Sequence, residues 1–351
     1  MKQIRFKILH LPFIFKAVNG INSMKRILPA LLLSVLFSQI VYGQTTVLQG
    51  KPIAEIYADF HYSINDTTST TGFSINRAHL GYRFEPGGKF TSTIIVNIGI
   101  PESLTPGANQ RRYAIIREAS VTYTEDKLKI AFGMVNTRIF DFQQQFWGKR
   151  YLGPEYQYLY GYGSVADVGI VIDYKLTDII KIDLSLLNGE GFSNIQLDNS
   201  LRTALGITMT TPKNYYFKMY SDFMKQKEVL QSAFIGFAGI KRDLFHFGAE
   251  ASFKTNANKT EGHNVWGVAT SGGINVTEKT ELFARYDYFT SYTEGGNTGS
   301  WNLFDGTIAK FGVQYRFTTF LRMALNFQGY YPNDKTIPRN DMIYLNAHFN
   351  F

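Results

Sequence analysis

The chain ends with nine residues of alternating side-chain character: Ile343-Tyr344-Leu345-Asn346-Ala347-His348-Phe349-Asn350-Phe351. Every second position from Ile343 is apolar, and Asn346, His348 and Asn350 fall between them. Side chains of a β-strand point alternately to opposite faces, so this stretch predicts a strand with one apolar and one polar face. The chain ends on the apolar face with an aromatic ring.

The same period of two recurs from residue 53 to residue 351, in segments of about ten residues, the length that crosses a bilayer at a tilt. The clearest apolar series are Phe90, Ile94, Val96, Ile98 and Ile100; Ala166, Val168, Ile170, Ile172 and Tyr174; Ile180, Ile182, Leu184 and Leu186; Ala309, Phe311, Val313, Tyr315 and Phe317; and Leu321, Met323, Leu325 and Phe327. No stretch beyond residue 43 has the ~20 consecutive apolar residues of a membrane helix. Any membrane span is therefore expected to consist of strands.

The connections between these segments alternate in length. Short turns are predicted at 86–88, 125–127, 177–178, 212–214, 242–243, 277–279 and 318–319. Longer polar loops are predicted at 65–71, 101–111, 139–163, 189–199, 225–229, 256–263, 293–302 and 332–339. Seven turns and eight loops predict an all-β, transmembrane antiparallel barrel of about 16 strands, with short periplasmic turns and longer extracellular loops. The segment from Val229 to Ile240 alternates poorly, so 14 or 18 strands stay open.

A secreted β-sandwich also alternates, and it is the alternative to a barrel. A sandwich packs its apolar faces together, whereas closing a barrel of this size turns the apolar face outward. Water would then meet a very large apolar patch, which soluble proteins avoid. The alternating connections and the terminal Phe351 favour the barrel.

The net charge of +8 comes mainly from the amino-terminal end. Residues 1–43 hold six basic and no acidic residues, which leaves 30 Lys and Arg against 28 Asp and Glu in residues 44–351. Lys25 and Arg26 precede the apolar run Ile27 to Leu36, as in a secretory signal peptide. We therefore predict an over-annotated extension at 1–23, a signal peptide at 24–43 and an outer-membrane barrel at 44–351, with no nucleic-acid partner. There is no Cys for a lipid anchor or a disulfide.

A barrel of 16 strands is wide enough to leave an aqueous lumen. The alternation of side chains along each strand predicts which charged residues face the lumen. The basic ones are Arg77, Arg83, Lys129, Lys181, Arg202, Lys218, Arg285, Lys310, Arg316 and Arg322. The acidic ones are Glu55, Asp59, Glu118, Asp167, Asp173, Asp183, Asp222, Glu250 and Asp287. Ten bases against nine acids predict a nearly neutral wall, and selectivity would require that charges of one sign cluster.

The third predicted loop, residues 139–163, is the longest. It is rich in aromatic residues, so we expect it to be packed and not disordered. Our hypothesis is that it folds into the bore as a constriction; the alternative is that its rings cover the rim or a subunit interface. The candidate constriction residues are Phe140, Asp141, Phe142, Phe146, Trp147, Lys149, Arg150, Tyr151 and Glu155.

Short motifs resemble a known family. The stretch from Ile116-Arg117-Glu118-Ala119 to Gly133-Met134 is similar to a hairpin of the phosphate-selective porin O and P family. The segment from Phe146-Trp147-Gly148 to Val168-Gly169 and the element Leu187-Asn188-Gly189-Glu190-Gly191 are also similar. The resemblance covers most of residues 50–351 and implies a trimeric 16-stranded porin with an inward third loop. Anion specificity in that family is associated with a ladder of Arg and Lys, whereas here acids are interspersed, so phosphate selectivity is not carried over.

The expected function is passive diffusion of small hydrophilic solutes or anions through the bacterial outer membrane. The expected partners are outer-membrane lipid, two further copies in a homotrimer, and the barrel assembly machinery, which would recognise Phe351. We expect no cofactor, metal or enzyme activity, because the six His residues show no metal-ligand spacing and there is no G-x-S-x-G or H-E-x-x-H motif. A channel specific for phosphate or sugar, a barrel with a structural or adhesive role, and a barrel enzyme using His61 or His246 stay open.

Overall fold

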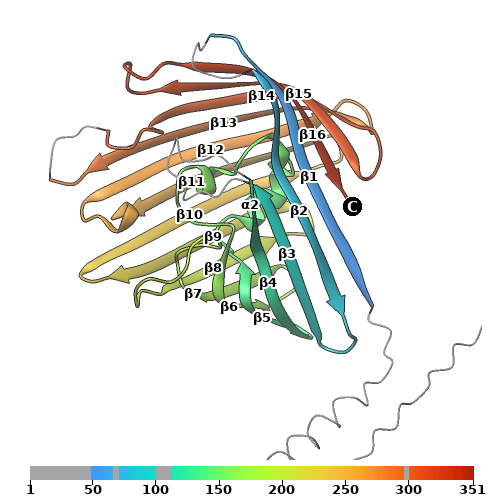
Figure 1. Cartoon of the computed structure of the whole chain (residues 1–351), viewed down its shortest axis with the longest axis vertical. Coiled ribbons are helices and arrows are strands. Elements are labelled where there is room, and N and C mark those ends of the chain that lie inside the picture. The colour runs from blue at the N-terminus through green and yellow to red at the C-terminus, as the bar shows by residue number, and fades with distance from the viewer. Residues whose placement is uncertain (1–48, 66–70, 100–111, 296–299) are drawn as a thin grey trace, which may run out of the picture. The chain divides into compact units, whose positions relative to one another are not determined.

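The computed structural model of the chain describes residues 49–65, 71–99, 112–295 and 300–351. These residues form a closed antiparallel barrel of sixteen strands, in which every strand pairs with its neighbours in sequence and β1 pairs with β16 (Figure 1). The strands are β1 (Gln49–Ser63), β2 (Gly72–Glu85), β3 (Phe90–Gly99), β4 (Tyr113–Glu125), β5 (Leu128–Asn136), β6 (Ala166–Lys175), β7 (Ile180–Leu187), β8 (Arg202–Thr210), β9 (Tyr215–Gln226), β10 (Val229–Lys241), β11 (Phe245–Thr255), β12 (His263–Asn275), β13 (Thr280–Thr293), β14 (Gly306–Arg316), β15 (Leu321–Pro332) and β16 (Asn340–Asn350). The predicted fold and the count of sixteen are confirmed.

Four short helices complete the described secondary structure: α2 (Asp141–Trp147), η1 (Arg150–Leu152), α3 (Tyr156–Leu159) and η2 (Ala257–Lys259). The first three belong to the connection between β5 and β6. Within the described part of the chain, no helix is long and apolar enough to span a membrane. The predicted extension at 1–23 and the signal peptide at 24–43 lie outside the described residues.

All seven predicted short turns are found, and they lie at one end of the barrel, called here the turn end; the opposite end is the loop end. The prediction of a longer loop at 225–229 is wrong. β9 ends at Gln226 and β10 begins at Val229, so Lys227 and Glu228 alone make the turn. Lys227 adopts the left-handed conformation, with φ 53°, that a tight hairpin turn requires.

The poorly alternating segment of β10 is nevertheless a regular strand, paired with β9 and β11 without a register shift. Its inward residues include the buried Ala233, Ile235 and Phe237. These positions are apolar because they pack against the third loop and not against water. The sequence pattern blurs where both faces of a strand are apolar.

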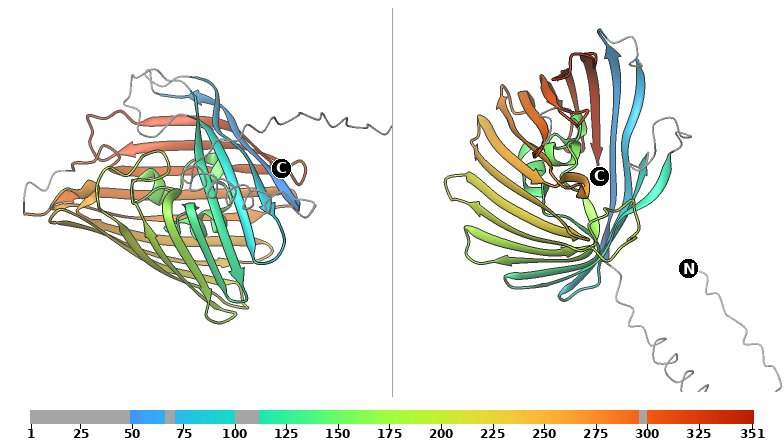
Figure 2. Two further views of the ribbon diagram at one scale, coloured as in Figure 1. Left: turned by 60° about the horizontal axis from the view of Figure 1, so that its bottom comes forward. Right: turned by 90° about the vertical axis from the view of Figure 1, so that its left-hand side faces the viewer.

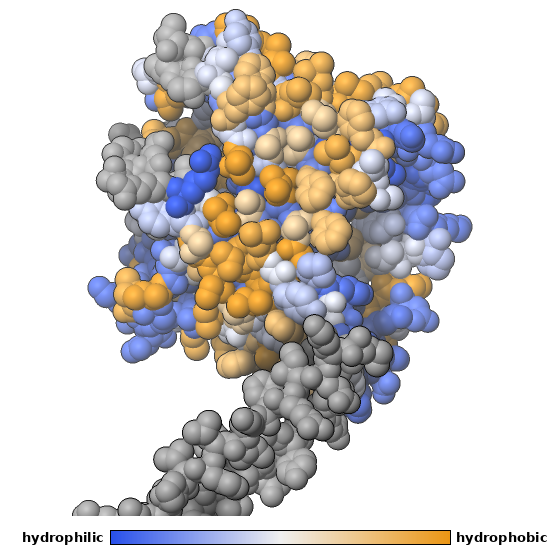
Figure 3. All heavy atoms as spheres, turned by 45° about the vertical axis from the view of Figure 1, so that its right-hand side comes forward, coloured by the Kyte–Doolittle hydropathy of each residue, from blue (hydrophilic) through white to orange (hydrophobic). Residues whose placement is uncertain are grey.

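Outward positions carry large exposed apolar side chains around the barrel, among them Phe132, Met219, Phe311 and Leu325. Figure 3 shows such residues gathered across the middle of one outer face, with hydrophilic residues toward its edges. An apolar band of this kind is the surface that a transmembrane barrel presents to lipid. Closing the sheet also leaves no unpaired edge, which the hydrocarbon interior of a membrane requires.

Two β-bulges interrupt the alternation. The register passes from Tyr57 opposite Arg77 to Ala58 opposite Ile75, so Asn76 is the extra residue. Similarly, Ile95 is opposite Glu118 and Val96 is opposite Ile116, so Arg117 is extra. An extra residue in one strand lets two adjacent side chains point to the same face. As a result, Asn76 and Arg117 lie on the inner face beside their neighbours.

Candidate functional site

The third loop lies inside the ring of strands, where Figure 2 shows its helices in green. Its two ends meet where the Thr137 amide donates to the Val165 carbonyl oxygen at 3.1 Å and the Thr137 hydroxyl donates to the Ser164 carbonyl oxygen at 2.6 Å. Helix α2 begins where the Phe142 amide donates to the Asp141 carboxylate at 2.8 Å. It ends at Gly148, which takes the left-handed conformation common at helix ends.

One face of α2 packs on the inner wall from β9 to β13. The Phe146 ring lies 4.9 Å from the Phe237 ring and 5.4 Å from the Tyr216 ring, between centroids. Gly239 and Gly248 make room for it, since a Cβ at either position would lie under 3 Å from the Phe146 ring. Burying a Phe side chain contributes roughly 1.5–3 kcal/mol, so this contact holds the helix against the wall.

The second half of the loop is attached by polar contacts. The Gln157 side-chain amide donates to Glu250 at 2.6 Å and to Ser252 Oγ at 3.1 Å. Tyr162 donates to the Ser252 carbonyl oxygen at 3.1 Å. The Tyr160 ring stacks on the Phe289 ring at 4.3 Å. These contacts join the loop to β11, 90 to 95 residues later in the chain, and to β13, farther still.

One buried ion pair adds to the attachment, and a second lies within the loop itself. Lys149 Nζ lies 2.6 Å from Glu281, and Arg150 Nε lies 3.1 Å from Glu155. Burial lowers the pKa of Lys149, against the opposing effect of Glu281. Burial likewise raises the pKa of Glu155, against the opposing effect of Arg150. Each charge in these pairs therefore depends on its partner to offset the loss of water.

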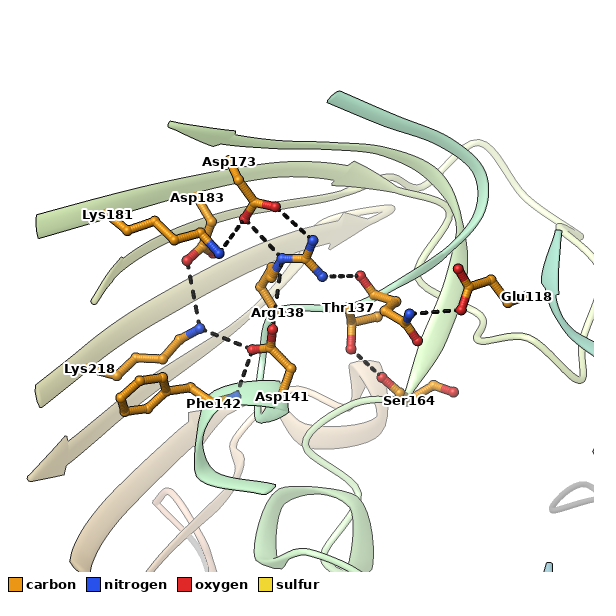
Figure 4. Close-up of polar contacts among 11 residues, drawn as sticks. Glu118, Thr137, Arg138, Asp141, Phe142, Ser164, Asp173, Lys181, Asp183 and Lys218 are labelled. Atoms are coloured by element: carbon orange, nitrogen blue, oxygen red, sulfur yellow. Dashed lines mark hydrogen bonds and ion pairs between the residues drawn. The ribbon is translucent and has the colours of Figure 1, made fainter. Parts of the chain in front are cut away.

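A charged network fixes the start of the loop (Figure 4). The guanidinium of Arg138 donates to both oxygens of Asp173 on β6, at 3.0 and 2.8 Å. Lys181 lies 3.0 Å from the same carboxylate. Lys218 on β9 lies 3.3 Å from Asp141 and 3.6 Å from Asp183. The network joins β6, β7 and β9 to the first residues of the loop.

Two cavities lie along the bore on the side that the loop leaves free. The loop-end cavity, about 540 Å³, lies between the loop and strands β1–β4 and β14–β16; the turn-end cavity, about 710 Å³, lies beside β4–β9. Arg117 on β4 and Val165 at the end of the loop line both. The two cavities therefore share these residues in their lining.

The predicted constriction residues divide between these surfaces. Arg150 and Tyr151 line the loop-end cavity, and Phe140, Asp141 and Phe142 line the turn-end cavity. The other predicted loop residues line neither cavity and contact the wall or one another: Phe146, Trp147, Lys149 and Glu155.

The predicted wall charges also divide. Three of them line the loop-end cavity, namely Asp59, Arg77 and Lys310, and four line the turn-end cavity, namely Lys129, Asp173, Lys181 and Lys218. The remaining predicted residues line neither cavity: Glu55, Arg83, Glu118, Asp167, Asp183, Arg202, Asp222, Glu250, Arg285, Asp287, Arg316 and Arg322. Six of these are buried against neighbouring side chains, namely Asp167, Asp183, Arg202, Asp222, Arg285 and Asp287, while Arg83 and Arg316 are exposed near the turn end.

Three residues of the site were not predicted from the alternation of side chains along the strands. Asn76 and Arg117 lie on bulges, where the period of two is broken. Arg138 precedes the predicted loop and belongs to no strand. A basic residue next to the end of a strand is too common to be a signal by itself, and only the register reveals a bulge.

No protein family model matches the chain, and comparison with curated proteins found no match. Solved structures do match. OmpF of Salmonella typhi, in a complex with daunomycin, has a TM-score of 0.65 at 10% identity, over 88% of this chain and 99% of that one. The outer membrane channel DcaP of Acinetobacter baumannii has a TM-score of 0.63 at 14% identity, over 87% and 97%. OmpT of Vibrio cholerae, described as a trimer form, has a TM-score of 0.58 at 13% identity, over 86% and 99%.

These likenesses show a fold. The chain has the porin fold, that of a barrel in a bacterial outer membrane, in agreement with the apolar band on its outer face. The resemblance to the phosphate-selective porins is not supported beyond this shared fold.

Proposed function

We propose that the protein is an outer-membrane porin, a passive diffusion channel for small hydrophilic solutes, in which the loop at 139–163 sets the size limit. The observation that carries the proposal is the position of this loop, packed on the inner wall from β9 to β16 beside two cavities that share Arg117 and Val165 in their lining. Solutes would pass on the free side of the loop, through these two cavities. A wall of charged and polar side chains keeps such a passage wet, and no energy source is needed.

Liposomes that contain the purified protein test the proposal. We expect small uncharged sugars such as arabinose to cause swelling, and a planar bilayer to show steps of open-channel current. Larger oligosaccharides should cause progressively less swelling, because the loop limits the cross-section. Vesicles that stay sealed to arabinose, together with bilayers without current steps, would instead favour a barrel with a structural or adhesive role.

We also propose that the protein works as a homotrimer. Two observations support this: the solved OmpT structure is described as a trimer form, and the motif resemblance implies the same state. Native mass spectrometry of the protein extracted in mild detergent measures the oligomer directly, and a monomer alone would contradict the proposal.

The terminal Phe351 gives a further prediction, since we propose that the barrel assembly machinery recognises it. In the folded barrel its backbone pairs with Ala54, while its side chain is 70% exposed. We therefore expect Phe351→Ala to reduce the amount of folded barrel in the outer membrane, with little change in the unfolding free energy of the purified protein. Phe90→Ala, which removes another exposed ring at the turn end, is the matched control. Equal amounts of both variants in the membrane would contradict a role in recognition.

A further inference from the structure

The free side of the bore is more basic than the wall as a whole. Among the described residues, the loop-end cavity is lined by four basic side chains, Arg77, Arg117, Arg150 and Lys310, and by one carboxylate, Asp59. Seven basic and four acidic side chains line the turn-end cavity. The prediction of a nearly neutral wall counted every inward charge alike, whereas only the charges that face the passage act directly on a solute.

The position of the third loop produces this excess of basic over acidic side chains around the cavities. Glu250 and Glu281 accept hydrogen bonds from Gln157 and Lys149 of the loop, at 2.6 Å each, and line neither cavity. These carboxylates are covered on the side of the barrel that the loop occupies. Arg77 on β2 and Arg117 on β4 line the loop-end cavity on the opposite side.

Arg77, Arg117 and Arg150 come from β2, β4 and the loop to one cavity. Each has one carboxylate partner: Glu55 at 3.7 Å, Glu118 at 3.3 Å and Glu155 at 3.1 Å, respectively. None of these three carboxylates lines the cavity. The three arginines thus line the cavity, while the carboxylates that balance their charges do not.

The same three arginines are close enough to act on one another. The positive charge of Arg77 acts on both Arg117 and Arg150. The Nε of Arg117 is buried and has no hydrogen-bond acceptor among the described residues. An anion bound here would gain charge-assisted hydrogen bonds and relieve the repulsion between like charges.

Aromatic rings lie under two of the arginines. The Arg77 guanidinium lies 4.9 Å from the centroid of Tyr57, and that of Arg150 lies 5.3 Å from the centroid of Tyr158. Phe192 and Tyr344 also line the cavity. Its volume of about 540 Å³ is that of a small-molecule site, in which apolar walls surround a few well-placed polar groups.

We propose that the loop-end cavity is a transient binding site for small monocarboxylates that carry a ring. The carboxylate accepts hydrogen bonds from Arg117, with Arg77 and Arg150 beside it, and the ring packs against the half-buried Tyr158 and Tyr344 that line the cavity. The proposal rests on the proposed diffusion function and names its substrate class. Binding is weak, because a solute that crosses the channel must also leave the site.

Benzoate and its uncharged analogue benzamide are the probes. Added to a planar bilayer that contains the full-length mature protein, benzoate should reduce the open-channel current at lower concentrations than benzamide does. Arg117→Gln should raise the half-blocking concentration of benzoate about tenfold, the effect of losing a charge-assisted contact, and leave that of benzamide unchanged. Arg117→Lys should fall between, because Lys keeps the charge without the fork-shaped donor pair. The matched control is Arg83→Gln, which removes a guanidinium at the turn end outside both cavities.

The outcomes separate this proposal from the one on which it rests. Absence of current and of arabinose entry in the wild-type protein would refute the diffusion function itself. An open channel in which Arg117→Gln and Arg83→Gln change benzoate block equally would refute the site alone. So would a reversal potential that shows cation preference in a KCl gradient, or block by inorganic phosphate at lower concentrations than by benzoate, because phosphate has no ring for the tyrosines.

Discussion

Deletion of residues 143–152 should raise the single-channel conductance severalfold. These residues include most of α2 and all of η1, the part of the loop that occupies the bore beside β9–β16. The current through an open channel rises with its free cross-section, and sixteen strands enclose a lumen far wider than the passage left beside the loop. The measurement is the size of current steps in a planar bilayer at fixed KCl concentration.

The matched control removes residues 334–336 from the last loop, where all three residues are exposed and none lines either cavity. Its conductance should equal that of the wild-type protein. The folded state of the 143–152 deletion variant is checked by the shift in its electrophoretic mobility on heating. Unchanged conductance in a folded sample would contradict the proposal that the loop is the constriction.

A second variant tests the loop position without removing it. The chain has no native Cys, so Gln157→Cys together with Ser252→Cys introduces a unique thiol pair where the two native side chains meet at 3.1 Å. A short thiol-specific cross-linker should join them and leave the conductance unchanged, because the loop already lies there. Failure to cross-link would show that the loop lies elsewhere.

Loss of the Asp173 carboxylate should be the most destabilising single change in the network of Figure 4. Asp173→Asn keeps the shape of the side chain but leaves the buried Arg138 guanidinium without the anion that its Nε and Nη2 contact. Breaking one partner out of a buried pair costs about 3–5 kcal/mol. The measurement is the free energy of unfolding by urea of the protein in detergent micelles. A second measurement is the fluctuation of the open-channel current, which reports on movement of the first residues of the loop.

The matched control is Asp178→Asn. Asp178 pairs with Lys175 at 2.8 Å, but its side chain is 96% exposed, and such surface pairs contribute only about 0–1 kcal/mol. The double variant Arg138→Gln, Asp173→Asn should recover much of the lost stability, because no buried charge is then left alone. Equal effects of Asp173→Asn and Asp178→Asn would show that the Arg138 contact does not hold the loop.

The barrel could be predicted from sequence because its main signal is local. The series Ile180, Ile182, Leu184 and Leu186 needs no knowledge of distant residues to reveal an outward apolar face, and the short turns show where each hairpin reverses. The signal was weakest in β10, where Ala233, Ile235 and Phe237 face the third loop, so that strand looked irregular in sequence and is regular in the structure. The two-residue turn at Lys227 and Glu228 was likewise hidden by the polar residues Lys225 and Gln226 at the end of β9.

The site itself depends on contacts between distant parts of the chain. Composition predicted that residues 139–163 would be packed, but the partners Gln157 and Ser252 are 95 residues apart, and nothing local to either one names the other. The alternation of side chains also predicted that Arg77 faces the lumen, but it did not predict this for Arg117. Arg117 lies on a bulge, and a bulge depends on the register between β3 and β4.

The sequence by itself determined an apolar outer face, a polar inner face and the positions of the short turns, because the side-chain period and the turns are properties of short segments. Only the tertiary structure decided which side of the lumen the loop occupies, and hence which charges it covers and which line the two cavities. The physical reason is that coverage depends on the packing of rings such as Phe146 against a wall more than seventy residues away in sequence, and no periodicity records that distance.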